Sequence, residues 1–255
     1  MTIIAILQAR MTSTRLPGKV LKSMQGKPML AHQIARIAQA EHIDHIVVAT
    51  SNETSDDAIE ALCHKLNIDC YRGSLNDVLD RYYQASVQHA ATHVVRLTGD
   101  CPLIDANIID NIIELHISTN ADYTSNCAPA TFPDGLDAEV LTFATLKKVW
   151  QQAKKPSERE HVTPYVHNNT HLFNRENYTY HQDLTAYRWT VDEPEDFEFV
   201  KLVYKALYPK KPYFTFTDVL DLLKENPKLT TINQGFTRNE GLLKSQQLDQ
   251  ELGYE

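Results

Sequence analysis

The sequence has few cysteines, no long hydrophobic run and no excess of positive charge, and each absence excludes a class of protein. No apolar stretch approaches the roughly 18 residues that a membrane span needs, since the longest clean one, residues 3–7, has the length of a strand. No basic region precedes that stretch, so a secretory signal is not expected. We therefore expect a cytoplasmic protein without a membrane partner.

Charge and cysteine spacing narrow the possibilities further. The net charge of −8 argues against a general nucleic-acid-binding protein. The four cysteines show neither the spacing of metal ligands nor the pattern of a disulfide scaffold. Hydrophobic residues make up 42% of the chain and charged residues 23%, which are ordinary values for a folded domain. An enzyme or a binding protein remains.

Short apolar runs alternate with segments of helical periodicity through the first half of the chain. The runs that predict strands are residues 3–7, 45–50, 68–71 and 94–97. Helices are predicted between them, one opened by Pro28 and one capped by Asp105. This order predicts an α/β fold, a mostly parallel central sheet with helices on both faces. Ligands of such sheets bind beyond the carboxyl ends of the strands.

The second half of the chain is less regular. Strands are predicted at residues 122–126, 137–141 and 187–191, and helices at residues 145–153, 157–162, 194–207 and 217–225. No linker or internal repeat divides the chain. We therefore expect a single domain over residues 1–232, followed by a polar tail or arm over residues 233–255.

The loop after the first predicted strand carries the clearest chemical signal. Arg10, Arg15 and Lys19 fall within ten residues of each other in an acidic protein, with hydroxyl groups and backbone amides between them. A polyphosphate is bound by such a set of fork-shaped donors, a point charge and N–H groups. The loop is neither a Walker loop nor a G-x-G-x-x-G dinucleotide loop. The alternative is a solvated basic loop.

Two carboxylates that lie far apart in the sequence are candidate metal ligands. Asp100 follows the strand that ends at Leu97, and Asp192 follows the strand predicted to end at Val191. Both are expected at one edge of the sheet, facing the basic loop, where their oxygens suit Mg²⁺. Asp100 could instead be a turn former, and Asp192 could cap the helix that Pro194 opens.

Other polar residues in the second half are candidate contacts for a sugar. Asp137 and Glu139 lie two apart on a predicted strand, hence on one face, and could bind sugar hydroxyls or simply be solvated. Arg159, Glu160 and His161 lie on a helical stretch that could face an acceptor sugar or form an exposed run of charges. The histidines show no H-E-x-x-H or related metal spacing.

Several motifs resemble those of one group of enzymes. The string Ala9-Arg10-x-x-Ser13-x-Arg15-Leu16-Pro17-Gly18-Lys19 resembles the opening loop of the cytidylyltransferases that activate 3-deoxy-manno-octulosonate and acylneuraminates. The rest of the chain resembles their relatives of the spore coat polysaccharide biosynthesis protein F type. The matching motifs are Tyr71-Arg72-Gly73-Ser74, Asp77-Val78-Leu79-Asp80-Arg81-Tyr82, Thr98-Gly99-Asp100-Cys101-Pro102-Leu103, Pro133-Asp134-Gly135-Leu136-Asp137-Ala138-Glu139, Arg159-Glu160-His161-Val162-Thr163-Pro164-Tyr165 and Thr190-Val191-Asp192-Glu193-Pro194-Glu195-Asp196. One departure is Thr98, where the octulosonate enzymes carry glutamine.

The resemblance implies a glycosyltransferase-A-like nucleotidyltransferase fold (the nucleotide-diphospho-sugar transferase fold), CTP as substrate, Mg²⁺ as cofactor and a homodimer. It implies that Lys19, Arg10 and Arg15 act on the triphosphate and that Asp100 and Asp192 hold the metal. The positions that it assigns to nucleotide binding are Ala9, Arg10, Ser13, Arg15, Lys19, Arg72, Arg81 and Gly99. Asp137, Glu139, Arg159, Glu160 and His161 are the candidate substrate contacts.

The predicted reaction is therefore the transfer of CMP from CTP to a sugar or sugar acid with release of pyrophosphate, which would supply an activated sugar for surface polysaccharide or glycoconjugate synthesis. Three alternatives stay open. One is a glycosyltransferase on the same fold, although the Asp-x-Asp metal motif is not found after a strand. The others are a nucleotidyltransferase that uses another nucleotide and a non-catalytic nucleotide-binding subunit.

Overall fold

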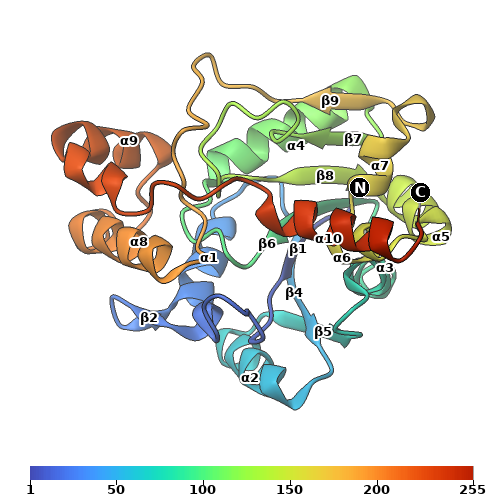
Figure 1. The fold of residues 1–255 in the computed structure, drawn as a ribbon, viewed down its shortest axis with the longest axis horizontal. Helices are drawn as coiled ribbons and strands as arrows, with labels where there is room; N and C mark the ends of the chain where they lie inside the picture. The colour runs from blue at the N-terminus through green and yellow to red at the C-terminus, as the bar shows by residue number, and fades with distance from the viewer. Residues whose placement is uncertain (255) are drawn as a thin grey trace.

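A seven-stranded sheet forms the centre of the protein in the computed structural model, which describes residues 1–254 (Figure 1). Its strand order is β5-β4-β1-β6-β8-β7-β9, and β2 and β3 form a separate ribbon. The strands are β1 (Ile3–Gln8), β2 (Ser23–Met24), β3 (Lys27–Pro28), β4 (His45–Ser51), β5 (Asp69–Gly73), β6 (His93–Thr98), β7 (Tyr123–Ser125), β8 (Glu139–Thr142) and β9 (Arg175–Asn177). Among these, β8 pairs antiparallel with both its neighbours, and the other pairs of the large sheet are parallel. The predicted mostly parallel sheet is confirmed.

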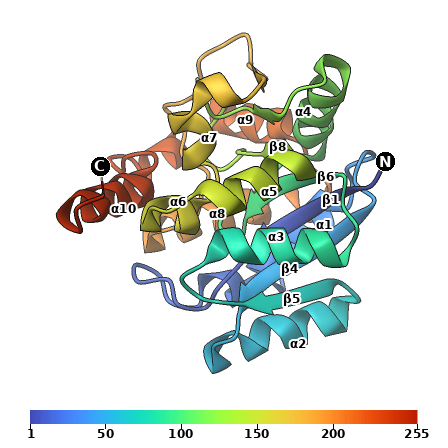
Figure 2. The ribbon, with the colours of Figure 1, turned by 90° about the vertical axis from the view of Figure 1, so that its right-hand side faces the viewer.

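Helices cover both faces of this sheet. They are α1 (Met29–Ile37), α2 (Asp57–Leu66), α3 (Val78–Gln88), α4 (Ala106–Thr119), α5 (Phe143–Gln152), α6 (Pro156–His161), α7 (Pro164–Asn168), α8 (Pro194–Leu207), α9 (Phe216–Glu225) and α10 (Glu240–Glu251). Alternate side chains of β1 belong to two separate cores: Ile4 and Ile6 pack with α3 and α5, while Ile3, Ala5 and Leu7 pack with α1, α4 and α8. Figure 2 shows α3, α5 and α6 on the first of these faces. None of the helices in residues 1–254 is long and apolar enough to cross a lipid bilayer.

The strand predicted at residues 187–191 is wrong. This segment makes only an isolated bridge between Arg188 and Asp134. The backbone N–H groups of Trp189 and Thr190 donate to the carbonyl of Asp134, and that of Val191 donates to the carbonyl of Asp100. The apolar pattern of the segment reflects a deep burial of Trp189 and Val191 between these two loops, rather than a place in the sheet.

The segment predicted as a polar tail or arm lies against the body of the protein. Its helix α10 runs alongside α6 (Figure 1), and the buried carboxylate of Asp249 accepts hydrogen bonds from the backbone and side chain of Ser157. On the same two helices, His161 lies 2.9 Å from the hydroxyl of Ser245. Polar contacts rather than apolar burial therefore attach this segment, which explains why hydrophobic periodicity did not reveal it.

Two loops cross closely where the second half of the chain meets the sheet edge. Gly135 has a φ of +106°, and a Cβ atom at this position would lie 2.4 Å from the backbone nitrogen of Thr190 and 2.6 Å from the carbonyl carbon of Trp189. Only glycine combines this backbone conformation with this approach. The crossing fixes the path of residues 188–192, and hence the place of Asp192.

We expect Gly135→Ala to lower the free energy of unfolding by about 3 kcal/mol, the sum of backbone strain and a steric clash with a segment that cannot move aside. Gly235→Ala is the matched control, because Gly235 has a similar φ of +99° and nothing within 4 Å of its Cβ position. Strain alone predicts a loss of about 1 kcal/mol there. Urea unfolding measures both; equal losses would show that the close crossing is unimportant.

Candidate active site

A cleft of about 510 Å³ opens at the carboxyl ends of β1 and β6. Most of the residues predicted from the sequence line it: Ala9, Arg10, Ser13, Arg15, Lys19, Arg81, Gly99, Asp100, Asp137, Glu139, Glu160, His161 and Asp192. Arg72 and Arg159 do not. Segments that are far apart in the sequence thus converge on one cavity, whose volume is that of a small-molecule site.

The loop that follows β1 is held by a buried carboxylate. Asp56 is fully buried and accepts hydrogen bonds from the backbone of Met11, at 2.7 Å, and from Ser51. Burial raises the pKa of Asp56, but the bonds from Ser51 and Met11 outweigh it, so the pKa is lowered and the group stays charged. The backbone N–H of Gly18, which has a φ of +66°, closes the loop onto the carbonyl of Met11. The loop is therefore fixed at both ends.

Lys19 ends this loop and is buried between the two predicted metal ligands. Its ammonium lies 2.8 Å from Asp192 Oδ1 and 3.6 Å from Asp100 Oδ2, and it also donates to the carbonyl of Val191 at 2.7 Å. Burial lowers the pKa of Lys19, but the attraction of Asp100 and Asp192 outweighs burial and raises it above its ordinary value. These distances bring Asp100 and Asp192 together around Lys19, although the segment before Asp192 is not the strand that the prediction assumed.

The two loop arginines differ in how firmly they are held. Arg15 Nη2 lies 3.1 Å from Asp192 Oδ1, while its Nη1 lies 3.2 Å from Glu193 and 3.1 Å from Glu240 of α10. Arg10 is 42% exposed and comes only within 3.7 Å of Glu160. Both guanidinium groups thus reach the cleft, Arg15 already neutralised by carboxylates and Arg10 nearly free.

Arg81 lies in the cleft wall with part of its hydrogen-bonding capacity unused. Its side chain is 1% exposed, yet Nε and Nη1 have no partner among the described residues. Burial lowers the pKa of its guanidinium. An unpaired buried guanidinium is costly, so a ligand that brings oxygen or ring-nitrogen acceptors here would satisfy it.

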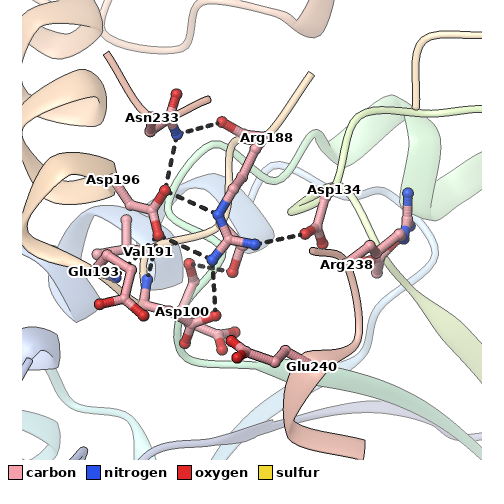
Figure 3. A network of polar contacts seen from close by, with 12 residues as sticks. Asp100, Asp134, Arg188, Val191, Glu193, Asp196, Asn233, Arg238 and Glu240 are labelled. Carbon is pink, nitrogen blue, oxygen red and sulfur yellow. Dashed lines mark hydrogen bonds and ion pairs between the residues drawn. The ribbon is translucent and has the colours of Figure 1, made fainter. Parts of the chain in front are cut away.

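Arg188 is the centre of a network that joins three carboxylates (Figure 3). Its Nε and Nη2 bind the two oxygens of Asp196 at 2.9 and 3.0 Å, Nη2 also reaches Asp192 Oδ2 at 3.2 Å, and Nη1 reaches Asp134 Oδ2 at 3.1 Å. Burial lowers the pKa of Arg188, but Asp196, Asp134 and Asp192 raise it above its ordinary value. The fully buried Asp196 also caps α8 by accepting from the backbone of Asp192 and Glu193.

The predicted substrate contacts Asp137 and Glu139 both line the cleft, each already paired with an arginine. Asp137 binds Arg238, which comes from the C-terminal segment. Glu139 binds Arg96 and accepts from the hydroxyl of Tyr123 at 2.5 Å. Burial raises the pKa of Glu139, but Arg96 outweighs it and holds the pKa well below its usual range. Glu139 therefore has a structural partner as well as a place in the cleft.

The structure places two predicted residues away from the cleft. Arg72 pairs with Asp57 at 2.7 Å and Glu60 at 2.8 Å and bonds the carbonyl of Ser51, so it holds α2 against β4 and β5. Arg159 binds Asp77, the residue that caps α3, and the carbonyl of Trp150. The ion pairs of Arg72 and Arg159 hold secondary-structure elements together, which a motif match cannot distinguish from binding a ligand.

The cleft residues that were not among the sequence candidates include four charged ones that join the ion-pair network: Asp134, Arg188, Arg238 and Glu240. Asp134 lies in a motif that carried the family resemblance, and Arg188 precedes another by two residues, so those motifs were the available signal. Arg238 and Glu240 belong to the segment predicted as a tail. No motif around Arg238 or Glu240 in the sequence indicates that these residues line a cleft.

The donor set at the edge of the sheet fits a hard divalent cation. No cluster of three or more histidine, cysteine, aspartate or glutamate side chains within residues 1–254 forms a metal cage. Mg²⁺ does not need one, because it takes one or two carboxylates and completes its shell with phosphate oxygens and water. Asp100 and Asp192, which converge on Lys19, are two carboxylates that fit this requirement.

We expect Glu139→Gln to lower the free energy of unfolding by about 3 kcal/mol, because it leaves the guanidinium of Arg96 buried without its carboxylate. The pair Arg96→Met with Glu139→Met removes both charges and should cost less than the single change. Urea unfolding at pH 7 measures the two variants. A double variant less stable than Glu139→Gln would contradict this account of the pair.

The chain is similar to known enzymes in sequence and in structure. The family described as cytidylyltransferase matches residues 4–247 of the chain. The spore coat polysaccharide biosynthesis protein SpsF of Bacillus subtilis is 34% identical over 236 residues, which cover 90% of this chain and 97% of SpsF. The structure of a cytidylyltransferase from Leptospira borgpetersenii superposes with a TM-score of 0.88 at 34% identity, covering 93% of this chain and 99% of the other.

The octulosonate enzymes are similar over a shorter part. The 3-deoxy-manno-octulosonate cytidylyltransferase of Geobacter metallireducens is 34% identical over 113 residues, 44% of each chain. The resemblance noted in the loop and strand motifs is confirmed, and so is the nucleotide-sugar transferase-like fold. On the family match and the full-length similarity to SpsF and the Leptospira enzyme, the chain belongs to the cytidylyltransferase family of nucleotidyltransferases.

Proposed function

We propose that the protein transfers CMP from CTP to a sugar or sugar acid and releases pyrophosphate, in the synthesis of a surface polysaccharide or glycoconjugate. The observation that carries this proposal is the convergence of Lys19, Asp100 and Asp192, with Arg15 beside them, in one nucleotide-sized cleft. The names of SpsF and of the octulosonate enzymes support the choice of nucleotide and of acceptor class.

Basic and acidic side chains of the cleft have different roles in this reaction. Arg10, Arg15 and Lys19 bind the triphosphate and stabilise the negative charge that builds on it during displacement at the α-phosphorus. Arg81 lies where its unused N–H groups can donate to the base. Asp100 and Asp192 would hold Mg²⁺, which when bound would supply positive charge to offset that of the phosphates. A nucleophilic serine or cysteine is not needed.

We place the acceptor in the part of the cleft that the second half of the chain lines. Asp134, Asp137 and Glu160 line the cleft and come from the second half of the chain, as do Arg238 and His161. Burial and the neighbouring Asp137 raise the pKa of Asp134 above its ordinary value, which shows how closely the carboxylates crowd together. Carboxylates accept hydrogen bonds from hydroxyls, so this end suits a polyhydroxylated acceptor, and Arg238 is available to an acidic group of a sugar acid.

Nucleotide binding must exchange one set of ion pairs for another. Arg15 and Lys19 now neutralise Asp192, Glu193 and Glu240. When the triphosphate takes these cations, the carboxylate of Asp192 is released to the metal. The pairing seen here is thus the resting arrangement of groups that bind substrate.

Lys19→Met removes the ammonium and keeps the length of the side chain. We expect calorimetric titration with Mg²⁺ to show selective CTP binding by the wild type and a Kd raised by about 100-fold in the variant, since a charge-assisted contact of about 3 kcal/mol is lost. Lys22→Met, three residues on and outside the cleft lining, should bind CTP as the wild type does. Preference for another nucleotide would change the substrate, and an unchanged Kd in Lys19→Met would refute the loop's role.

Asp100→Asn keeps the shape of the side chain and removes its charge. We expect pyrophosphate release from CTP in the presence of a panel of sugar acids and Mg²⁺ to fall by about 100-fold, because electrostatic support of the reacting phosphate is lost. Circular dichroism should match the wild type, and Asp221→Asn, at an exposed site on α9, should keep full activity. Wild-type rates in Asp100→Asn would overturn the metal-binding role.

A further inference from the structure

Arg188 lines the cleft, but it has no part in the reaction proposed above, because its guanidinium is paired with carboxylates. The side chain is 9% exposed, and its guanidinium holds both oxygens of Asp196 in a two-pronged contact (Figure 3). Asp196 is itself fixed, since it caps α8 and accepts from Asn233 at 2.9 Å. A planar fork anchored in this way leaves its remaining N–H groups in set directions.

Those remaining N–H groups point at two cleft carboxylates. Nη2 reaches Asp192 Oδ2 at 3.2 Å, which leaves Asp192 Oδ1 toward Lys19, 2.8 Å away, and Arg15, 3.1 Å away. Nη1 reaches Asp134 Oδ2 at 3.1 Å. One oxygen of Asp192 is thus held on the side away from Lys19, and the other faces the groups that bind substrate.

We propose that Arg188 is a positioning residue of the transferase, which orients Asp192 and Asp134 so that Asp192 presents one chosen oxygen to the cleft. The proposal rests on the proposed function, because Asp192 matters only if this cleft binds metal and CTP. Arg188 acts through Asp192, because the hydrogen bonds of its guanidinium go to carboxylates.

Only arginine can make this set of contacts. The four hydrogen bonds use Nε, Nη1 and Nη2 of one rigid plane and join three carboxylates. A lysine at this position would keep the positive charge, but its single ammonium cannot span Asp196, Asp192 and Asp134 together. Arg188→Lys therefore separates the effect of the positive charge from the effect of the guanidinium geometry.

The test compares Arg188→Lys with the wild type through Mn²⁺ binding in the presence of CTP, measured by electron paramagnetic resonance of the free ion. Groups that orient a metal ligand typically change metal affinity by about 10- to 100-fold, so we expect a Kd for Mn²⁺ raised by about 10-fold. The KM for CTP should stay within about twofold, while kcat falls by about 10-fold.

Asn233→Ala is the control for a merely structural role. Asn233 donates to the carbonyl of Arg188 and to Asp196 but reaches no cleft carboxylate. We expect it to lower the melting temperature and to leave Mn²⁺ affinity unchanged. Loss of Mn²⁺ affinity in proportion to lost stability in both variants would overturn the proposal, as would wild-type Mn²⁺ affinity in Arg188→Lys.

A double-variant cycle tests whether Arg188 acts through Asp192. In an Asp192→Asn background, Arg188→Lys should cause no further loss of Mn²⁺ affinity, and additive losses would contradict the proposal. Should Arg188→Lys not fold, Asp196→Asn breaks the same fork and takes its place in both experiments. Failure of the wild type to bind CTP would instead refute the proposed function, so the two failures are distinguishable.

Discussion

The buried ammonium of Lys19 is the constraint on which the site depends. A charge removed from water must be compensated by opposite charge, and the compensation here comes from Asp100 and Asp192, at 3.6 and 2.8 Å. These residues belong to loops of the two halves of the chain. Folding around one lysine therefore brings together the loop after β1, the loop after β6 and the start of α8.

The second half of the chain reaches this place by a chain of close contacts rather than by joining the sheet. Residues 188–192 pass close to Gly135, which has no side chain to block them. Arg188 then holds this segment to the start of α8 through its hydrogen bonds to Asp196. The C-terminal segment contributes three further contacts: Asn233 donates to Asp196, Arg238 pairs with Asp137, and Glu240 pairs with Arg15. The cleft is thus lined partly by loops from the second half of the chain and partly by the segments that follow β1 and β6.

This division explains what the sequence could reveal. Apolar runs predicted β1, β4, β5 and β6, because a parallel strand that is buried on both faces is a continuous apolar run in the sequence. These strands also predicted the loop that carries Lys19 and the position of Asp100. The segment around Trp189 has the same apolar pattern but packs between loops, so pattern alone misassigned it. Arg72 and Arg159 matched motifs but serve ion pairs between elements, and Arg238 and Glu240 lie in a segment held by polar contacts that leave no periodicity.

We propose that one cleft holds the triphosphate on the loop after β1 and the metal on Asp100 and Asp192. A crystal structure with CTP and Mn²⁺, in which the anomalous scattering of manganese locates the metal, tests it most directly. We expect manganese bound by both carboxylates, with Arg15 and Lys19 turned from Asp192 to the phosphates. Manganese bound elsewhere, or a triphosphate that leaves the ion pair between Lys19 and Asp192 intact, would contradict it.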